Sequence, residues 1–270
     1  MAKIDKSLLS KAEWKRLREF RRREKQKARE QSHKNRSIRD TRLPVQEQTA
    51  PVIDSDKNLP IKQETKTHTN ENFQGENAFV LGNGTSRKPV DPEKLRSLGK
   101  IYGCNALYRT FDPDYLVAVD VKMVLELNKA GYQHKNPNVW TNPNKSLLKY
   151  KGFNFFNPSK GWSSGPTALW LASQHSYQNI YILGFDFRGL EDGARFNNIY
   201  ADTYNYKKST DSATFFGNWM RQTQNVIRDH PHINYIRVIA PDNYSPPELN
   251  KFENYSTLLL EDFLKKLENF

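Results

Sequence analysis

Hydrophobic residues concentrate in the later part of the chain, where short apolar runs alternate with segments of helical spacing. The apolar runs predict five strands, of which the third and fourth are nearly continuous in apolar character. Such continuity is typical of parallel strands buried on both faces. The predicted strands cover residues 78–82, 100–104, 115–120, 179–185 and 234–240.

The segments between these runs have the spacing of helices that bury one side. They cover residues 91–99, 121–131, 165–176 and 211–229, and a last helix is predicted over 256–270. Strands that alternate with helices predict an α/β domain over residues 77–270, with a Rossmann-like, open, mostly parallel sheet and helices on both faces. Ligands of such sheets bind beyond the carboxyl ends of the strands, so the residues that follow each strand are the first candidates for a site.

The preceding residues lack this pattern. Ser10 and Glu13 have capping-box spacing, and residues 10–31 continue without Gly or Pro, which predicts a helix within a basic tail over 1–44. Residues 45–76 are polar and without period, which is typical of a disordered linker.

Charge is as uneven as hydrophobicity. Residues 1–44 hold 16 Lys and Arg against 6 Asp and Glu, a surplus of ten within the net charge of +12. Three interpretations of this tail stay open: a solvated charged helix or disordered tail, a segment that binds nucleic acid or another polyanion, and a segment that docks on a protein partner.

The cysteine and histidine residues limit which disulfides and metal sites the chain can form. Cys104 is the single cysteine, which excludes an intrachain disulfide framework and fits a reducing compartment. The six histidines have no metal-binding spacing, so we expect no metal site. No apolar run of about 18 residues exists to span a bilayer, and the basic N-terminus lacks the apolar segment of a secretory signal. We therefore expect a cytoplasmic protein with no membrane span.

The first candidate loop, Gly82-Asn83-Gly84, follows the first predicted strand. It begins like a dinucleotide fingerprint, but Arg87 stands where close helix packing requires Gly or Ala, and the absence of GK[ST] excludes a P-loop. The backbone N–H groups of this loop and the Asn83 side chain could still face an anion. The alternative is an ordinary tight turn.

A second candidate loop, Ser163-Ser164-Gly165, heads a predicted helix. Pro166 suits the first helical turn, and two hydroxyls beside exposed N–H groups suit a phosphate or carboxylate. A plain helix cap is the alternative.

Further polar residues are expected on the same edge of the sheet. Four of them follow other strands: Asn105, Asp120, Asp186 and Arg188. Residues 200–211 add three tyrosines with Lys207 and Lys208, and are predicted to form either a mobile loop that meets negative charge or a packed lid.

Four motifs in this order resemble a known family. "VLGNGTS", "YGCN", "SSG" at the head of a helix and "IYILGFDF" resemble bacterial sialyltransferases of glycosyltransferase family 42. They are also similar to the related domain of flagellin-glycosylation proteins and hydroxymethylpterin pyrophosphokinase-like proteins. The resemblance covers roughly residues 77–240.

The resemblance implies a nucleotide-sugar donor, for which a CMP-linked sugar is one candidate, and no metal or other cofactor. It implies that Asn83, within Gly82-Asn83-Gly84, and Asn105 contact the donor. It places Ser163, Ser164 and Gly165 at the donor too.

Two positions depart from the family pattern. Arg188 replaces a tyrosine that holds the donor phosphate, and Tyr206 replaces the histidine that acts as general base. An unperturbed tyrosine, with a pKa near 10, is a poor base at neutral pH. Tyr206, Asp120 and Asp186 are therefore all candidate catalytic residues.

These observations predict a nucleotide-sugar-dependent, sialyltransferase-like glycosyltransferase or a related nucleotide-phosphate transferase. Arg188, Lys207 and Lys208 would neutralise the leaving group, and the acceptor would be a glycan, a protein or a nucleic acid. The alternative is a non-catalytic binding or structural, virus-like component whose basic arm binds nucleic acid or a partner protein. A pterin pyrophosphokinase, dependent on ATP and a divalent ion, is a third hypothesis.

Overall fold

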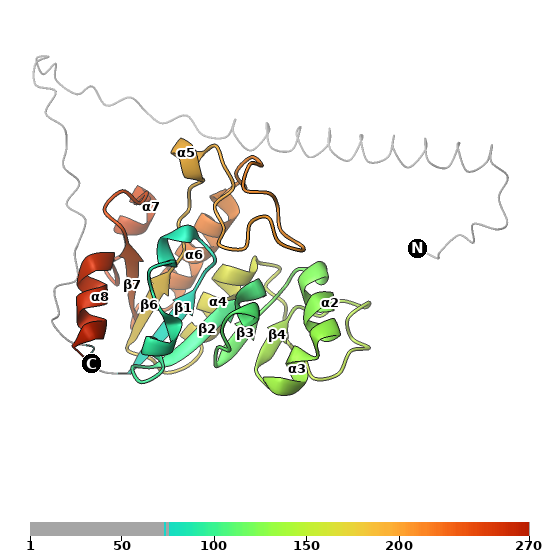
Figure 1. Ribbon diagram of the computed structural model, residues 1–270. Helices are drawn as coiled ribbons and strands as arrows, with labels where there is room; N and C mark the ends of the chain where they lie inside the picture. Colours follow the sequence, from blue (N-terminus) through green and yellow to red (C-terminus); the bar gives the residue numbers. More distant parts are fainter. Residues whose placement is uncertain (1–72, 74–75, 270) are drawn as a thin grey trace, which may run out of the picture. The chain divides into compact units, whose positions relative to one another are not determined.

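The computed structural model describes residue 73 and residues 76–269, so the predicted tail and nearly all of the linker lie outside the described residues (Figure 1). Its centre is an eight-stranded sheet in the order β5-β4-β3-β2-β1-β6-β7-β8. Every neighbouring pair of strands is parallel. The strands are β1 (Asn77–Leu81), β2 (Lys100–Cys104), β3 (Tyr115–Val117), β4 (Val139–Thr141), β5 (Asn154–Phe155), β6 (Asn179–Leu183), β7 (Asn234–Ile239) and β8 (Tyr255–Leu259).

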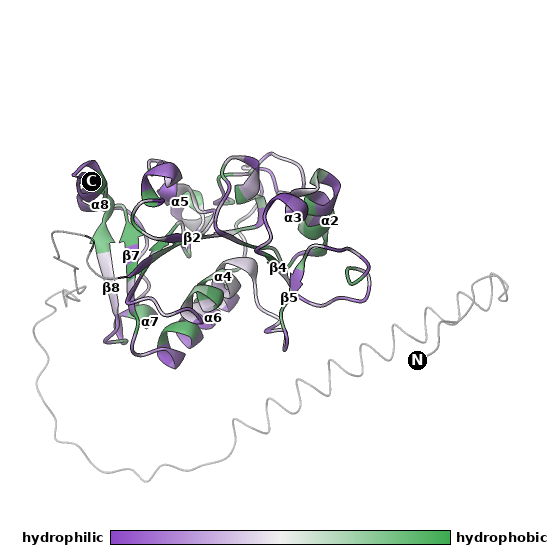
Figure 2. Cartoon of the chain, turned by 90° about the horizontal axis from the view of Figure 1, so that it is seen from below, coloured by the Kyte–Doolittle hydropathy of each residue, from purple (hydrophilic) through white to green (hydrophobic). Residues whose placement is uncertain are grey.

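Helices cover both faces of this sheet (Figure 2). One face carries α2 (Val121–Ala130), α3 (Tyr132–Lys135), α8 (Leu260–Glu268) and the 3-10 helices η2 (Thr85–Arg87), η3 (Pro92–Leu95) and η4 (Asn105–Arg109). The other face carries α4 (Ser164–Ser173), α6 (Gly217–Asp229) and α7 (Pro247–Asn250), and the short α5 (Leu190–Gly193) follows β6.

The side chains of β1 from Ala78 to Leu81 point alternately to the two faces of the sheet, and both sets are apolar. Phe79 and Leu81 join one hydrophobic cluster, while Ala78 and Val80 join the other, and all four are buried. A strand that is apolar on both sides requires cover on both sides. The predicted α/β, Rossmann-like parallel sheet is confirmed.

The boundaries differ most from the prediction in three places. Residues 255–259, mostly predicted as helix, form β8, which pairs with β7 from Tyr235↔Tyr255 to Ile239↔Leu259. Its apolar run continues without a break into the buried stripe of α8, which hides the boundary in the sequence. Helix α6 begins at Gly217 instead of residue 211, and within 91–99 only η3 forms. The short strands β4 and β5 were not predicted.

The order of the strands contains one reversal. The chain runs outward from β1 to β5, returns to form β6 on the other side of β1, and continues to β7 and β8. In open parallel sheets the crevice at such a reversal, outside the carboxyl ends of the strands, is the usual ligand position. Here it lies between β1 and β6.

Candidate functional site

A pocket of about 370 Å³ opens at this reversal. It is lined by most of the residues singled out in the sequence: Gly82, Asn83, Gly84, Asn105, Asp120, Ser163, Ser164, Gly165, Asp186, Arg188, Tyr206 and Lys207. Lys208 does not line it. Loops after β1, β2, β3 and β6, the head of α4 and residues 200–211 thus meet in one place, as expected for a binding site in this fold.

The loop after β1 is bound closely to the loop after β6. The Gly82 N–H donates to the Leu183 carbonyl at 2.8 Å, and the Gly84 N–H donates to the Gly184 carbonyl at 2.9 Å. A Cβ atom on Gly82 would lie 2.5 Å from the Gly184 oxygen, so no side chain fits there. The two glycines therefore have a packing reason, the close approach of two backbones.

Asp186 holds the same loop through its carboxylate. One oxygen accepts the Ser86 N–H at 3.2 Å and the Asn197 side-chain N–H at 3.0 Å, and the other accepts the Ser86 hydroxyl. The group is buried. A carboxylate with this many donors is suited to bracing the loop and poorly placed to take a proton from a substrate.

Arg87, the residue that breaks the dinucleotide pattern, lies buried behind the loop. Its Nε donates to the Gly82 carbonyl. Its Nη2 has no hydrogen-bond partner, and Arg87 forms no ion pair among residues 73 and 76–269. A buried guanidinium without a paired carboxylate adds positive potential near the pocket and favours an anionic ligand.

Asn83 is the buried polar residue at the centre of the site. Its Nδ2 donates to the Cys104 carbonyl at 3.2 Å and to the Tyr206 hydroxyl at 3.4 Å. Its Oδ1 has no partner in the described part of the chain. A buried acceptor without a donor is costly, so Asn83 Oδ1 is the atom best prepared to accept a hydrogen bond from a ligand.

Ser164 connects the head of α4 to two strand ends. Its hydroxyl donates to Asn105 Oδ1 at 2.8 Å and accepts the Val119 N–H at 3.1 Å. Asn105 has a left-handed backbone, with φ of 52°. Ser163 is the N-cap residue, but its side chain makes no capping hydrogen bond, so it does not act as the plain helix cap that was the alternative expectation. The N–H groups of the first α4 turn therefore have no side-chain cap from Ser163 and could meet an anion.

Residues 200–211, called here the tyrosine loop, bring Tyr206 against Asn83. The Tyr206 hydroxyl accepts the Ala106 N–H at 3.4 Å as well as the Asn83 amide. Burial raises the pKa of Tyr206 further above its ordinary value, and Cys104 adds to this, so the phenol is neutral at neutral pH. Tyr206 is thus equipped to donate a hydrogen bond, and it is a worse base than a free tyrosine.

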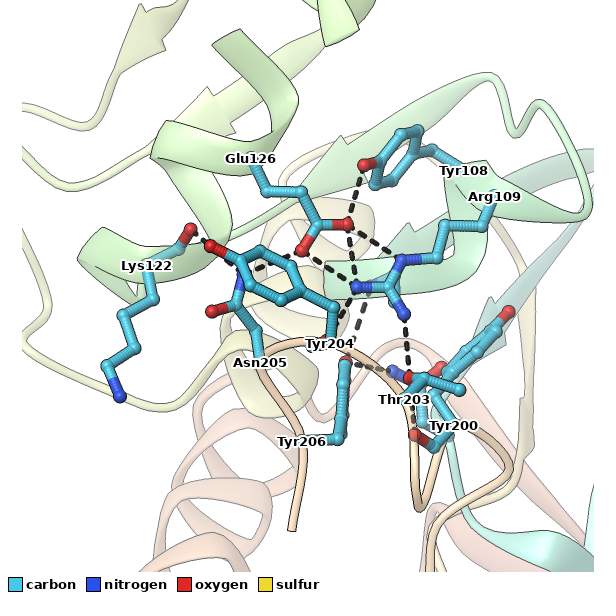
Figure 3. Close-up of polar contacts among 11 residues, drawn as sticks. Tyr108, Arg109, Lys122, Glu126, Tyr200, Thr203, Tyr204, Asn205 and Tyr206 are labelled. Carbon is cyan, nitrogen blue, oxygen red and sulfur yellow. Dashed lines mark hydrogen bonds and ion pairs between the residues drawn. The ribbon is translucent and has the colours of Figure 1, made fainter. Parts of the chain in front are cut away.

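The tyrosine loop is anchored, which favours the packed lid over the mobile loop (Figure 3). Arg109 Nη1 donates to the Thr203 hydroxyl and Nη2 to the Tyr204 carbonyl, both at 2.8 Å. Asn205 Nδ2 donates to Glu126 at 2.7 Å. Nothing in the sequence pointed to Arg109 or Glu126, because neither directly follows a strand or belongs to a motif.

The remaining charged residues of the pocket differ in their exposure and in their contacts with other side chains. Asp120 is exposed, and its carboxylate makes no hydrogen bond or ion pair with any described residue, so it is the candidate acid–base group that is available to a substrate. Arg188 lies 3.5 Å from Asp192, with 47 % of its side chain exposed. Lys207 lies over the Phe196 ring at 5.7 Å. Phe216 and Trp219 add an aromatic side to the pocket.

Among the described residues, no three His, Cys, Asp or Glu side chains are grouped so that they could hold a metal ion. Within the same residues, none of the helices combines the length and apolar character needed to cross a bilayer.

Comparisons with protein-family models, curated proteins and solved structures found no match.

Proposed function

We propose that this protein is a nucleotide-sugar-dependent glycosyltransferase of sialyltransferase type, and that the pocket between β1 and β6 binds the donor. The observation that carries the proposal is the convergence of Asn83, Asn105 and the Ser163-Ser164-Gly165 head of α4 at the reversal of the sheet. The resemblance noted in the sequence implied donor contacts for these same residues. A CMP-linked sugar is the donor to test first.

The transfer step follows from where the charges lie. The acceptor hydroxyl oxygen forms a bond to the anomeric carbon, while the bond from that carbon to the phosphate oxygen breaks and the phosphate leaves with the electron pair. Arg188 and Lys207 would stabilise the charge on the leaving phosphate. Asp120 would take the acceptor's proton, since Tyr206 is a neutral phenol and Asp186 is held by Ser86 and Asn197.

Titration calorimetry with CMP, CDP, UDP and GDP tests the donor site. We expect one of them to bind, and Asn83→Ala to weaken that binding by about tenfold or more, since a hydrogen bond in a buried site is lost. Lys207→Ala and Lys208→Ala form a matched pair, because Lys207 lines the pocket and Lys208 does not. Lys207→Ala should weaken binding, and Lys208→Ala should leave it unchanged.

The second candidate is a non-catalytic binding or structural component, and the observation that favours it is Tyr206 at the position of the family's general base. It predicts no response to any nucleotide and a salt-sensitive association with DNA or another polyanion that requires residues 1–44. The acceptor, the polyanion partner and the cytoplasmic location stay predictions from the sequence.

A further inference from the structure

Arg109 and Glu126 form a connected pair beside the pocket without lining it (Figure 3). The Arg109 guanidinium donates from Nε to one Glu126 oxygen and from Nη2 to the other, each at 2.7 Å. This two-point geometry is the strongest form of an arginine–carboxylate contact. Only 20 % and 12 % of the two side chains is exposed, so solvent weakens the pair less than it would at the surface.

The Arg109–Glu126 pair is held in place by η4 and α2, independently of the tyrosine loop. The Tyr108 hydroxyl donates to Glu126 at 2.7 Å, and Tyr108 and Arg109 both belong to η4, while Glu126 belongs to α2. Two elements that follow β2 and β3 thus fix the orientation of both charges before the tyrosine loop is added.

The other hydrogen bonds from Arg109, and one more to Glu126, join the pair to the tyrosine loop. Arg109 binds Thr203 and the Tyr204 carbonyl, and Glu126 accepts from Asn205. Asn205 has φ of 68°, so the chain turns sharply directly before Tyr206. The Arg109 guanidinium also lies 5.7 Å from the centre of the Tyr206 ring.

We propose that Arg109 and Glu126 are positioning residues that hold Tyr206 against Asn83, and that nucleotide binding depends on them although neither lines the pocket. This inference rests on the proposed function for its binding consequence. Without the pair, residues 203–205 keep only the Asn205 contact to the Lys122 carbonyl and contacts within their own loop, so the Tyr206 hydroxyl leaves both the Asn83 amide and the Ala106 N–H. The buried Asn83 side chain then loses one of its two acceptors and its fixed orientation toward the ligand.

The Ala106 amide reports directly on the position of Tyr206. It lies in the first turn of η4, where N–H groups have no partner within the helix, and the Tyr206 hydroxyl is its acceptor. Hydrogen exchange at this amide, followed by NMR on the full chain, therefore measures the contact itself. Tyr206→Phe removes the acceptor and defines the exchange rate of the unprotected amide.

The conservative variants Glu126→Gln and Arg109→Lys keep size or charge and break the two-point contact. We expect each to raise Ala106 exchange by about tenfold and to weaken nucleotide binding in the same direction as Tyr206→Phe. Combining Glu126→Gln with Tyr206→Phe should add little to Tyr206→Phe alone, because both act on one contact. Glu93→Gln is the matched control, since it breaks the Arg96–Glu93 ion pair at the surface.

Unchanged Ala106 exchange in both variants would overturn the proposal, as would raised exchange with unaltered nucleotide affinity. If the unmodified protein binds none of CMP, CDP, UDP and GDP, the proposed function fails by itself. The exchange measurement then still supports or overturns the role of Arg109 and Glu126 in holding Tyr206.

Discussion

Two walls of the pocket meet at Asn83 and Tyr206, and they are held by different contacts. The first wall, residues 82–87 with the loop 184–186, is joined by backbone hydrogen bonds between adjacent strand ends and by the Asp186 carboxylate. The second wall, the tyrosine loop, is held by side chains of Arg109 and Glu126 from elements distant in the chain. The first wall is therefore part of the sheet, whereas the second depends on side-chain hydrogen bonds, three of which come from Arg109 and Glu126.

The largest effect is expected from changes that separate the backbones of the first wall. A Cβ atom in Gly82→Ala would lie 2.5 Å from the Gly184 oxygen, and in Gly84→Ala 2.7 Å from the same atom. We expect each to lower the free energy of unfolding by about 2–3 kcal/mol, measured by urea denaturation. Gly165→Ala is the control, because its Cβ would lie 3.3 Å from the Phe185 ring and should cost little. Equal losses in all three variants would contradict the close approach of the two loops.

A somewhat smaller effect is expected at Asp186. In Asp186→Asn the new NH₂ group would face one of the donors from Ser86 or Asn197, so we expect a loss of about 1–3 kcal/mol in the free energy of unfolding. Asp120→Asn should change stability by about 0.5 kcal/mol or less and abolish transfer while nucleotide binding persists. A stable but inactive Asp186→Asn protein would contradict this assignment. It would indicate that Asp186 is the catalytic base and does not stabilise the first wall.

These two walls also differ in how far the sequence predicted them. The "GNGTS" and "GFDF" segments directly follow long apolar runs, so the rule for parallel sheets placed Asn83 and Asp186 at one edge without a structure. Tyr206, Lys207 and Lys208 were named from composition and resemblance, and Lys208 lies outside the pocket. Arg109 and Glu126 could not be predicted, because their contacts join residues separated by up to 95 positions with no periodic signal. β4 and β5 are too short to show a pattern of their own, with three and two residues.

Acid should weaken the second wall. Burial alone would raise the pKa of Glu126, but hydrogen bonds from Tyr108, Arg109 and Asn205 outweigh it, and the pKa lies below the ordinary value. The stabilisation is therefore complete above the ordinary Glu range, near pH 4.3, and is lost as pH falls through the lower value of the folded protein. We expect the difference in unfolding free energy between the unmodified protein and Glu126→Gln, roughly 1 kcal/mol at pH 7, to shrink below pH 4. A difference that grows in acid would contradict the assignment.

The smallest effect on stability is expected in a test that uses the thiol of Cys104, which lies at the end of β2 next to the strand that precedes the first wall. Its Sγ lies 3.6 Å from the Leu81 carbonyl, and burial raises its pKa to about 12, although the nearby Arg87 opposes the rise. Because only the thiolate reacts, labelling of Cys104 with iodoacetamide at pH 8 should be about a thousandfold slower than labelling of a free cysteine. The rate is measured on the folded protein, without denaturation. Gly82→Ala should speed the labelling and Glu126→Gln should not. If Glu126→Gln exposes the thiol as much as Gly82→Ala does, the two walls open together, and the tyrosine loop is part of the same unit as the sheet.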